Sequence, residues 1–255
     1  MDTNPRYKVL ARNMIEAVKA LWRGYPLTWV SRKDGLWYVI DREMGLYFCT
    51  YWRGRDLYAK GVRARLDDLC GVYGIDPTLS FSETDIVVDV GANVGEFALG
   101  CKRRGATVYA FEPDPIVFSA LSRNLPDDAF NVALFEENRD ITFYSSVRRA
   151  DSSVIEPDHF DKVVEVEART LDSFIEEHEI RNIAILKCDA EGAEPEVLMG
   201  ARKALKITQM VTIDCGAERR NESTEEEVRQ VLLECGFSVD PRSRERQIVI
   251  GERRT

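Results

Sequence analysis

Acidic side chains stand at or near the ends of several short apolar segments of this sequence. Asp89 lies in "IVVDVG", Glu112 follows "TVYAF", Asp189 follows "IAILKC" and Asp214 ends "QMVTID". Such segments are typical of buried parallel strands, whose carboxyl ends meet at the ligand-binding edge of a sheet. Carboxylates at that edge could accept hydrogen bonds from ligand hydroxyls, remove a proton or bind a divalent metal ion.

The first of these strands runs into a glycine turn at residues 91–95, "GANVG". Gly91 and Gly95 permit positive φ and close backbone approach, and the next helix begins with N–H groups that could face a carboxylate or phosphate. A plain tight turn is the alternative interpretation. Asn93 stands where a dinucleotide-binding motif has its second glycine, which a pyrophosphate requires. An amino-acid moiety does not require that close approach, so this turn, combined with a following strand that ends in Glu112, favours S-adenosylmethionine over NAD.

Glu112 lies 23 positions after Asp89, at the end of the second strand. An acidic residue there is placed to accept hydrogen bonds from both ribose hydroxyls of a nucleoside. It could instead only favour the start of the following helix through its charge.

Strands and helices alternate after Phe81, which predicts a Rossmann-like α/β fold with a mostly parallel sheet and helices on both faces. Thr224 with Glu227 predicts a capping box, and Gly236 a helix end. The expected strands are 86–90, 107–111, 129–134, 141–145, 162–168, 183–188, 209–214, 237–240 and 246–250, and the expected helices 95–103, 115–124, 170–178, 194–205 and 224–235.

Residues 1–80 form an N-terminal extension and residues 81–255 the main domain in this interpretation. The extension contains a helix over 1–24 and a β-hairpin around Asp34-Gly35. It also holds all four tryptophans, which either pack it onto the main domain or line a lid or substrate wall. They are Trp22, Trp29, Trp37 and Trp52.

Composition narrows the class of protein. The 255 residues are 44% hydrophobic and 31% charged with a formal net charge of −9, which argues against nucleic acid or anionic lipid as partner and favours small molecules. No signal sequence or membrane span is recognised, so a cytoplasmic protein is expected. The six cysteines are widely spaced and accompanied by only two histidines, which argues against a zinc site.

The sequence resembles the FkbM-type methyltransferases. The resemblance rests on "VVDVGANVGEFAL", "VYAFEPDP", "NVAL" at 131–134 and the long segment 168–201, with its pattern K-x-D-x-E-G-x-E-x-x-V-L-x-G-A. It implies a class I fold with a seven-stranded sheet and methyl transfer from S-adenosylmethionine to a hydroxyl oxygen of a sugar or natural product. The cofactor residues expected on this basis are Asp89, Gly91, Asn93, Gly95, Glu112, Pro113, Asp189, and Asn131 and Ala133 near the adenine.

The carboxylates at the strand ends also supply the catalytic candidates. Asp189 is the expected base, directly or as a Mg²⁺ ligand shared with Asp214, a position where many relatives have Glu. Glu191 and His159 are further candidates, although His159 lies in a polar loop and a solvated histidine is the alternative. Lys187 is the fourth catalytic candidate. Because it lies in an apolar strand it needs a carboxylate partner, for which Asp189 or Glu191 is expected, and this pairing could be purely structural.

The sequence also bears on two other functions. A nucleic-acid methyltransferase acting on nitrogen typically has D-P-P-Y or N-P-P-Y after the fourth strand, whereas this sequence has Asp189-Ala190-Glu191-Gly192. A non-catalytic domain that binds S-adenosylmethionine or a nucleotide as a sensor or scaffold remains the alternative. The acceptor, a small molecule or glycan, and the existence of a homo-oligomer are left open by the sequence.

Overall fold

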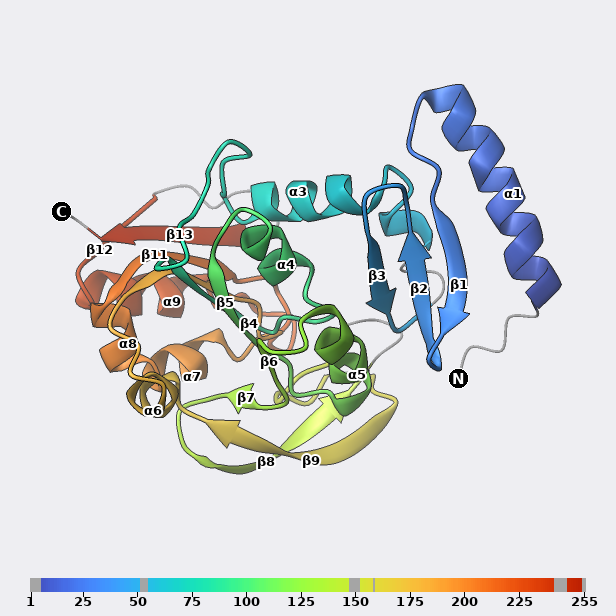
Figure 1. Ribbon diagram of the computed structural model, residues 1–255. Coiled ribbons are helices and arrows are strands. Elements are labelled where there is room, and N and C mark those ends of the chain that lie inside the picture. Colours follow the sequence, from blue (N-terminus) through green and yellow to red (C-terminus); the bar gives the residue numbers. More distant parts are fainter. Residues whose placement is uncertain (1–5, 51–54, 147–151, 158, 241–246, 254–255) are drawn as a thin grey trace.

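The structure is a computed structural model that describes residues 6–50, 55–146, 152–157, 159–240 and 247–253 (Figure 1). Its centre is a seven-stranded sheet of order β12-β13-β11-β10-β4-β5-β6. β13 runs antiparallel to both of its neighbours, and the other paired strands are parallel. The mostly parallel Rossmann-like sheet is therefore confirmed. The strands are β4 (Ile86–Val90), β5 (Thr107–Phe111), β6 (Ala129–Phe130), β10 (Ile183–Cys188), β11 (Thr208–Asp214), β12 (Phe237–Val239) and β13 (Ile248–Arg253).

Helices cover both faces of this sheet and bury its apolar strands in two clusters. One face packs against α3 (Val62–Val72), α4 (Glu96–Lys102) and α5 (Pro115–Asn124). The other packs against α6 (Leu171–Glu177), α7 (Glu194–Met199), α8 (Arg202–Lys206) and α9 (Glu225–Glu234). Helix α3 belongs to the extension and was not predicted.

A strand and a helix that were each predicted as continuous are split in two in the structure. The expected strand 129–134 becomes β6 and β7 (Ala133–Leu134), and β7 belongs to a second sheet of order β7-β9-β8 with β8 (Arg139–Ser145) and β9 (Lys162–Arg169). The expected helix 194–205 breaks between α7 and α8. A Cβ on Gly200 would lie 2.0 Å from the carbonyl oxygen of Phe135, and the Asp172 carboxylate accepts from the N–H groups of Lys203 and Ala204. The break lets the chain pack against the second sheet.

The extension consists of α1 (Arg6–Arg23), the sheet β1 (Trp29–Lys33), β2 (Leu36–Ile40) and β3 (Gly45–Phe48), and α3. The predicted hairpin is confirmed, with positive φ at Asp34 and Gly35 in its turn. Figure 1 shows α1 alongside β1 at one end of the molecule. Among the described residues, no helix is both long enough and apolar enough to span a bilayer.

The tryptophans do not share one role. Trp37 is buried in a cluster with Phe48 and Tyr58 of the extension and with Val94 and Val117 of the main domain. Trp29 is 44% exposed and Trp22 is 88% exposed. Packing of the extension by its tryptophans is therefore correct for Trp37 and wrong for Trp22, while Trp52 lies outside the described residues.

Candidate active site

A cavity of about 1840 Å³ adjoins the carboxyl ends of β4, β5 and β10. It exceeds the roughly 300–1,000 Å³ of a typical small-molecule pocket, so it has room for two ligands side by side. The main domain contributes the glycine turn and the residues that follow β5 and β10. The extension contributes the hairpin and α3. Its lining includes Val90, Gly91, Ala92, Asn93, Glu112, Pro113, Lys187, Asp189 and Glu191, and from the extension Arg32, Asp34, Leu36, Leu57, Arg65 and Tyr73.

The glycine turn is shaped by close packing. Gly91, Asn93 and Gly95 all have positive φ, at 65°, 52° and 89°. A Cβ on Gly91 would lie 1.8 Å from the carbonyl oxygen of Asp189, so only glycine lets the turn approach β10. Gly95 packs against Leu121 instead of lining the cavity.

The N–H groups of this turn are used within the protein. Ala92 N–H donates to the Phe111 carbonyl (2.9 Å), Asn93 N–H to Glu112 Oε2 (2.9 Å), Val94 N–H to the Asn93 side chain (3.0 Å), and Gly95 N–H to the Ala92 carbonyl (2.8 Å). The expectation of free N–H groups concerned the start of the following helix. It is wrong for Gly95, and also for Ala98, whose N–H donates to Asp89 Oδ2. The turn contributes shape and backbone surface.

Lys187 and Asp89 form a buried ion pair beneath the turn, with Nζ 2.9 Å from Oδ1. Lys187 Nζ also donates to the carbonyls of Val90 (3.1 Å) and Gly91 (2.8 Å), and Asp89 Oδ2 accepts from Ala98 N–H. Burial opposes the charge on Lys187, but attraction to Asp89 and Asp189 outweighs it and raises the pKa of the ammonium. The expected partner, Asp189 or Glu191, was wrong because β4 and β10 pair with Lys187 directly beside Asp89. Asp89 has no exposed surface and is absent from the cavity lining, so it supports the turn from beneath.

Glu112 lies immediately after β5 and lines the cavity while remaining 6% exposed. Its Oε2 accepts from Asn93 N–H and its Oε1 from Asp114 N–H, each at 2.9 Å, which fixes the carboxylate beside the turn. Burial raises the pKa of Glu112 to about 7, against the opposing effect of these hydrogen bonds. The carboxylate therefore titrates near neutral pH.

Of the other residues expected to bind the cofactor, two line the cavity and one does not. Pro113 and Ala133 line the cavity. Asn131 is exposed and outside the cavity lining, and its amide donates to the carbonyls of Glu112 (2.8 Å) and Pro113 (3.0 Å). Asn131 thus holds the loop after β5 in place.

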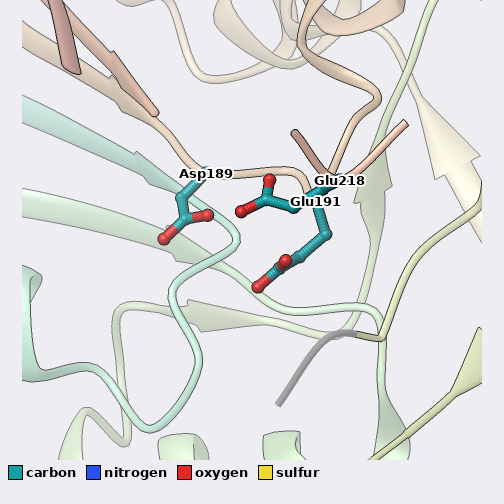
Figure 2. A group of neighbouring side chains, drawn as sticks. All are labelled: Asp189, Glu191 and Glu218. Atoms are coloured by element: carbon teal, nitrogen blue, oxygen red, sulfur yellow. The ribbon is translucent and has the colours of Figure 1, made fainter. Parts of the chain in front are cut away.

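Three carboxylates converge on the cavity side of β10. Asp189, Glu191 and Glu218 each offer an oxygen within 4.8 Å of the others, and Figure 2 shows their side chains gathered together. Tyr73 of the extension donates its hydroxyl to Asp189 Oδ2 at 2.7 Å, which orients that carboxylate. Glu218 and Tyr73 were not anticipated, because nothing in the local sequence links either of them to Asp189.

Asp214 and His159 do not join this group. Asp214 is 1% exposed and its Oδ1 accepts from Gly216 N–H at 3.2 Å, and the group of carboxylates around Asp189 contains Glu191 and Glu218 but not Asp214. Asp214 ends β11, and the chain brings Glu218, four residues later, to Asp189 instead. His159 is exposed and absent from the cavity lining, in keeping with a solvated histidine.

Glu194 supports the loop that carries Asp189 and Glu191. It has no exposed surface; its Oε1 accepts from the N–H groups of Ala190 and Gly192, both at 3.0 Å. Its Oε2 accepts from the Thr224 hydroxyl at 2.8 Å, and burial raises its pKa to about 7. The capping box of Thr224 with Glu227 was therefore wrong, because the Thr224 side chain serves Glu194 and makes no cap hydrogen bond. Gly236 does follow α9 with positive φ.

Another buried carboxylate joins the extension to the main domain. Glu96, at the start of α4, accepts from Tyr58 Oη (2.7 Å) and from Arg65 Nε (2.9 Å) and Nη2 (3.0 Å). This arrangement fixes α3 against α4 beside the glycine turn. Sequence reasoning missed it, since only the tertiary structure brings the three residues together.

The fold and cavity define a class I methyltransferase: a seven-stranded sheet with one antiparallel strand, a glycine turn after β4 and an acidic residue after β5. A family model described as "Methyltransferase FkbM domain" matches residues 89–239, more than half of the chain. The chain belongs to the FkbM methyltransferase family. S-adenosylmethionine is the methyl donor that this family implies.

Curated relatives agree with this assignment. The chain is 30% identical over 183 residues to the hexuronic acid methyltransferase AglP of Haloferax volcanii, covering 67% of this chain and 72% of the relative. It is 28% identical over 189 residues to the 2-O-methyltransferase NoeI of Sinorhizobium fredii, covering 66% and 77%. The crystal structure of an FkbM methyltransferase from Methylobacillus flagellatus matches with a TM-score of 0.50 at 18% identity, over 74% of this chain and 50% of that longer chain, which shows a shared fold.

Proposed function

We propose that this protein transfers a methyl group from S-adenosylmethionine to a hydroxyl oxygen of a small molecule or glycan. The observation that carries the proposal is the shared cavity, in which the glycine turn and Glu112 face the same space as Asp189 and the extension. The names of two relatives, a hexuronic acid methyltransferase and a 2-O-methyltransferase, support a sugar hydroxyl as acceptor.

The cavity residues fit the cofactor. Each oxygen of Glu112 accepts one backbone N–H and has a second lone pair, so the fixed carboxylate can accept from both ribose hydroxyls. Gly91 and Asn93 would border the rest of the cofactor, with Pro113 and Ala133 on the side of the loop after β5. Asp89 and Gly95 act from outside the cavity by shaping the turn.

When bound, S-adenosylmethionine supplies an electrophilic methyl group on a positively charged sulfur. The protein must then hold the acceptor oxygen in line with that methyl group and exclude water, which can contribute on the order of 7–11 kcal/mol. As the oxygen–carbon bond forms and the carbon–sulfur bond breaks, Asp189 would take the hydroxyl proton. A base of this kind contributes roughly 10²–10⁴-fold. Tyr73 positions Asp189 for this role through its 2.7 Å hydrogen bond.

A route assisted by Mg²⁺ is the alternative to a metal-free base. Asp189, Glu191 and Glu218 offer the carboxylate oxygens that Mg²⁺ prefers. A bound Mg²⁺ would lower the pKa of the acceptor hydroxyl. Excess EDTA distinguishes the routes: unchanged turnover indicates a metal-free base, whereas loss of turnover that Mg²⁺ restores indicates the ion.

The cofactor assignment is tested by calorimetry with S-adenosylhomocysteine. Glu112→Ala should weaken binding by about 1.5–3 kcal/mol, the range for hydrogen bonds to a charged group. Glu226→Ala, an exposed change on α9, is the control and should bind normally. Equal affinity in Glu112→Ala, or tighter binding of NAD than of S-adenosylhomocysteine, contradicts the assignment.

Catalysis is tested separately by incubating the protein with labelled S-adenosylmethionine and a panel of glycans and secondary metabolites. Transfer of label to a hydroxyl supports the proposal. Tight cofactor binding with no transfer to any acceptor class favours the sensor or scaffold.

A further inference from the structure

Helix α1 turns its apolar face outward. Seven large apolar side chains of this helix are between 50% and 88% exposed, and Ala11 lies among them. At 3.6 residues per turn they occupy one continuous face, about 140° of the helix circumference, with no charged residue inside it. We call this the outward face; it consists of Tyr7, Leu10, Ala11, Met14, Ile15, Val18, Leu21 and Trp22.

The arrangement is the reverse of an ordinary surface helix, which buries its apolar stripe. The buried residues of α1 are Val9, Asn13 and Ala20, two small or medium apolar side chains and one amide. Asn13 pairs with the edge of β1, donating to the Val30 carbonyl (2.8 Å) and accepting from Val30 N–H (3.2 Å). Arg55 donates to Asn13 Oδ1 (2.6 Å) and to the Arg12 carbonyl (3.1 Å). These contacts fix the orientation of the helix, so the outward face is a structured surface.

Basic side chains border the outward face. Lys8, Arg12, Lys19 and Arg23 fall along one flank at helical spacing, and Arg6 lies on the other side. Glu16 is the single acidic residue of the helix and pairs with Arg12 (3.1 Å) and Lys19 (3.0 Å). The helix is thus strongly basic, although the whole chain has a formal net charge of −9.

We infer that α1 docks the protein on an anionic lipid surface. A helix with a wide apolar face, an aromatic residue such as Trp22 and a Lys/Arg-rich border is the pattern of helices that lie in the plane of a membrane interface. Charge complementarity selects this occupant, since lipid phosphates attract the basic flank while the apolar face enters the headgroup boundary. A second copy of α1 fits less well: antiparallel pairing about a two-fold axis brings the basic flank against the same flank of the partner.

The position of α1 suits this role. It packs along β1 at one end of the molecule, away from the central sheet (Figure 1). The same extension lines the cavity through Arg32, Leu36 and Leu57. Because α1 lies at this end, a membrane bound to the outward face would not contact the helices that pack on the main sheet.

The test is sedimentation of the full chain with vesicles of phosphatidylcholine alone or mixed with phosphatidylglycerol, at low and high salt. We expect binding to the anionic vesicles that weakens at high salt. The double variant Val18→Glu with Leu21→Glu should lower the vesicle-bound fraction at least tenfold. The matched control is Met199→Glu with Leu233→Glu, which adds the same charge at exposed apolar positions of the main domain and should bind like the parent.

Circular dichroism and S-adenosylhomocysteine affinity establish that both double variants are folded. Absence of binding by the parent protein, or equal binding to neutral and anionic vesicles, overturns the inference. Sedimentation equilibrium without lipid tests whether a second copy of the chain covers the outward face. If the parent is a dimer and the Val18→Glu with Leu21→Glu variant is a monomer, the outward face serves self-association and the inference is overturned.

Discussion

Asp189 and Lys187 are two residues apart at the end of β10, yet they have separate partners. Lys187 pairs with Asp89, and Asp189 accepts from Tyr73. Asp189→Asn therefore leaves no buried charge without its counterion. We expect it to lower turnover by about 10²-fold or more while S-adenosylhomocysteine affinity stays within about threefold, because a base or metal ligand is lost and the cavity shape is kept.

Labelled methyl transfer and calorimetry measure these two quantities. Tyr73→Phe is the companion variant: it removes the hydrogen bond that orients Asp189 and should lower turnover less than Asp189→Asn does. A fully active Asp189→Asn enzyme would remove Asp189 from the mechanism and direct attention to Glu191.

The Lys187–Asp89 pair predicts a large effect on stability. Lys187→Met leaves the fully buried Asp89 carboxylate without its counterion and should lower the free energy of unfolding by about 3–5 kcal/mol. Lys203→Met, which breaks an exposed pair with Glu176, is the control and should leave it nearly unchanged, because solvent screens that pair. Urea denaturation followed by circular dichroism measures both. Similar small changes in the two variants would contradict a structural role for the buried pair.

At the scale of elements, the extension is part of the cavity wall. Trp37, Phe48 and Tyr58 share a core cluster with Val94, immediately after Asn93 of the glycine turn. Deleting the extension would expose this core, so a single substitution on the cavity side tests the wall more sharply.

Leu57 is such a residue, because it lines the cavity and is 37% exposed. Leu57→Ser should raise the KM for the acceptor several-fold and leave S-adenosylhomocysteine affinity unchanged, since it lies on the extension and not on the cofactor turn. Leu79→Ser, at an exposed site outside the cavity lining, should alter neither. Unchanged acceptor kinetics in Leu57→Ser would mean that this part of the extension only packs.

For the molecule as a whole, two buried carboxylates couple stability to pH. Burial raises the pKa of both Glu112 and Glu194 to about 7, above the ordinary value of 4.5. Between about pH 4.5 and pH 7 the folded protein keeps these protons while the unfolded chain releases them. Their contribution to the free energy of unfolding is therefore full below pH 4.5 and is lost as pH rises through 7, by up to about 3 kcal/mol for each group.

Ligand-free urea denaturation across this pH range measures the effect. Glu194→Gln removes one of the two titrating groups. Its free energy of unfolding should therefore change less with pH than that of the parent, whatever its value at a single pH. Glu226→Gln, an exposed change on α9, should retain the parent dependence. A pH dependence equal to the parent's in Glu194→Gln would contradict a raised pKa at that residue.

The sequence by itself determined the class of fold, the glycine turn and the acidic residues at the strand ends. These depend on local signals: alternating strand and helix periodicity, glycines that need positive φ, and carboxylates placed just after apolar runs. The family resemblance was also carried by contiguous segments, from the turn at Gly91 to the stretch around Asp189.

Only the tertiary structure decided which groups meet. Lys187 lies beside Asp89 because of the register of β4 and β10, and Tyr73 reaches Asp189 from 116 residues away. Glu194 binds Thr224 in place of the predicted cap, since its own position in the core requires a hydrogen-bond donor. The net charge argued against a lipid partner. It is a sum over the whole chain, however, and does not show which face of α1 is buried. Hydrogen-bond partners and exposed faces depend on packing between distant segments, and local sequence patterns carry no information about that packing.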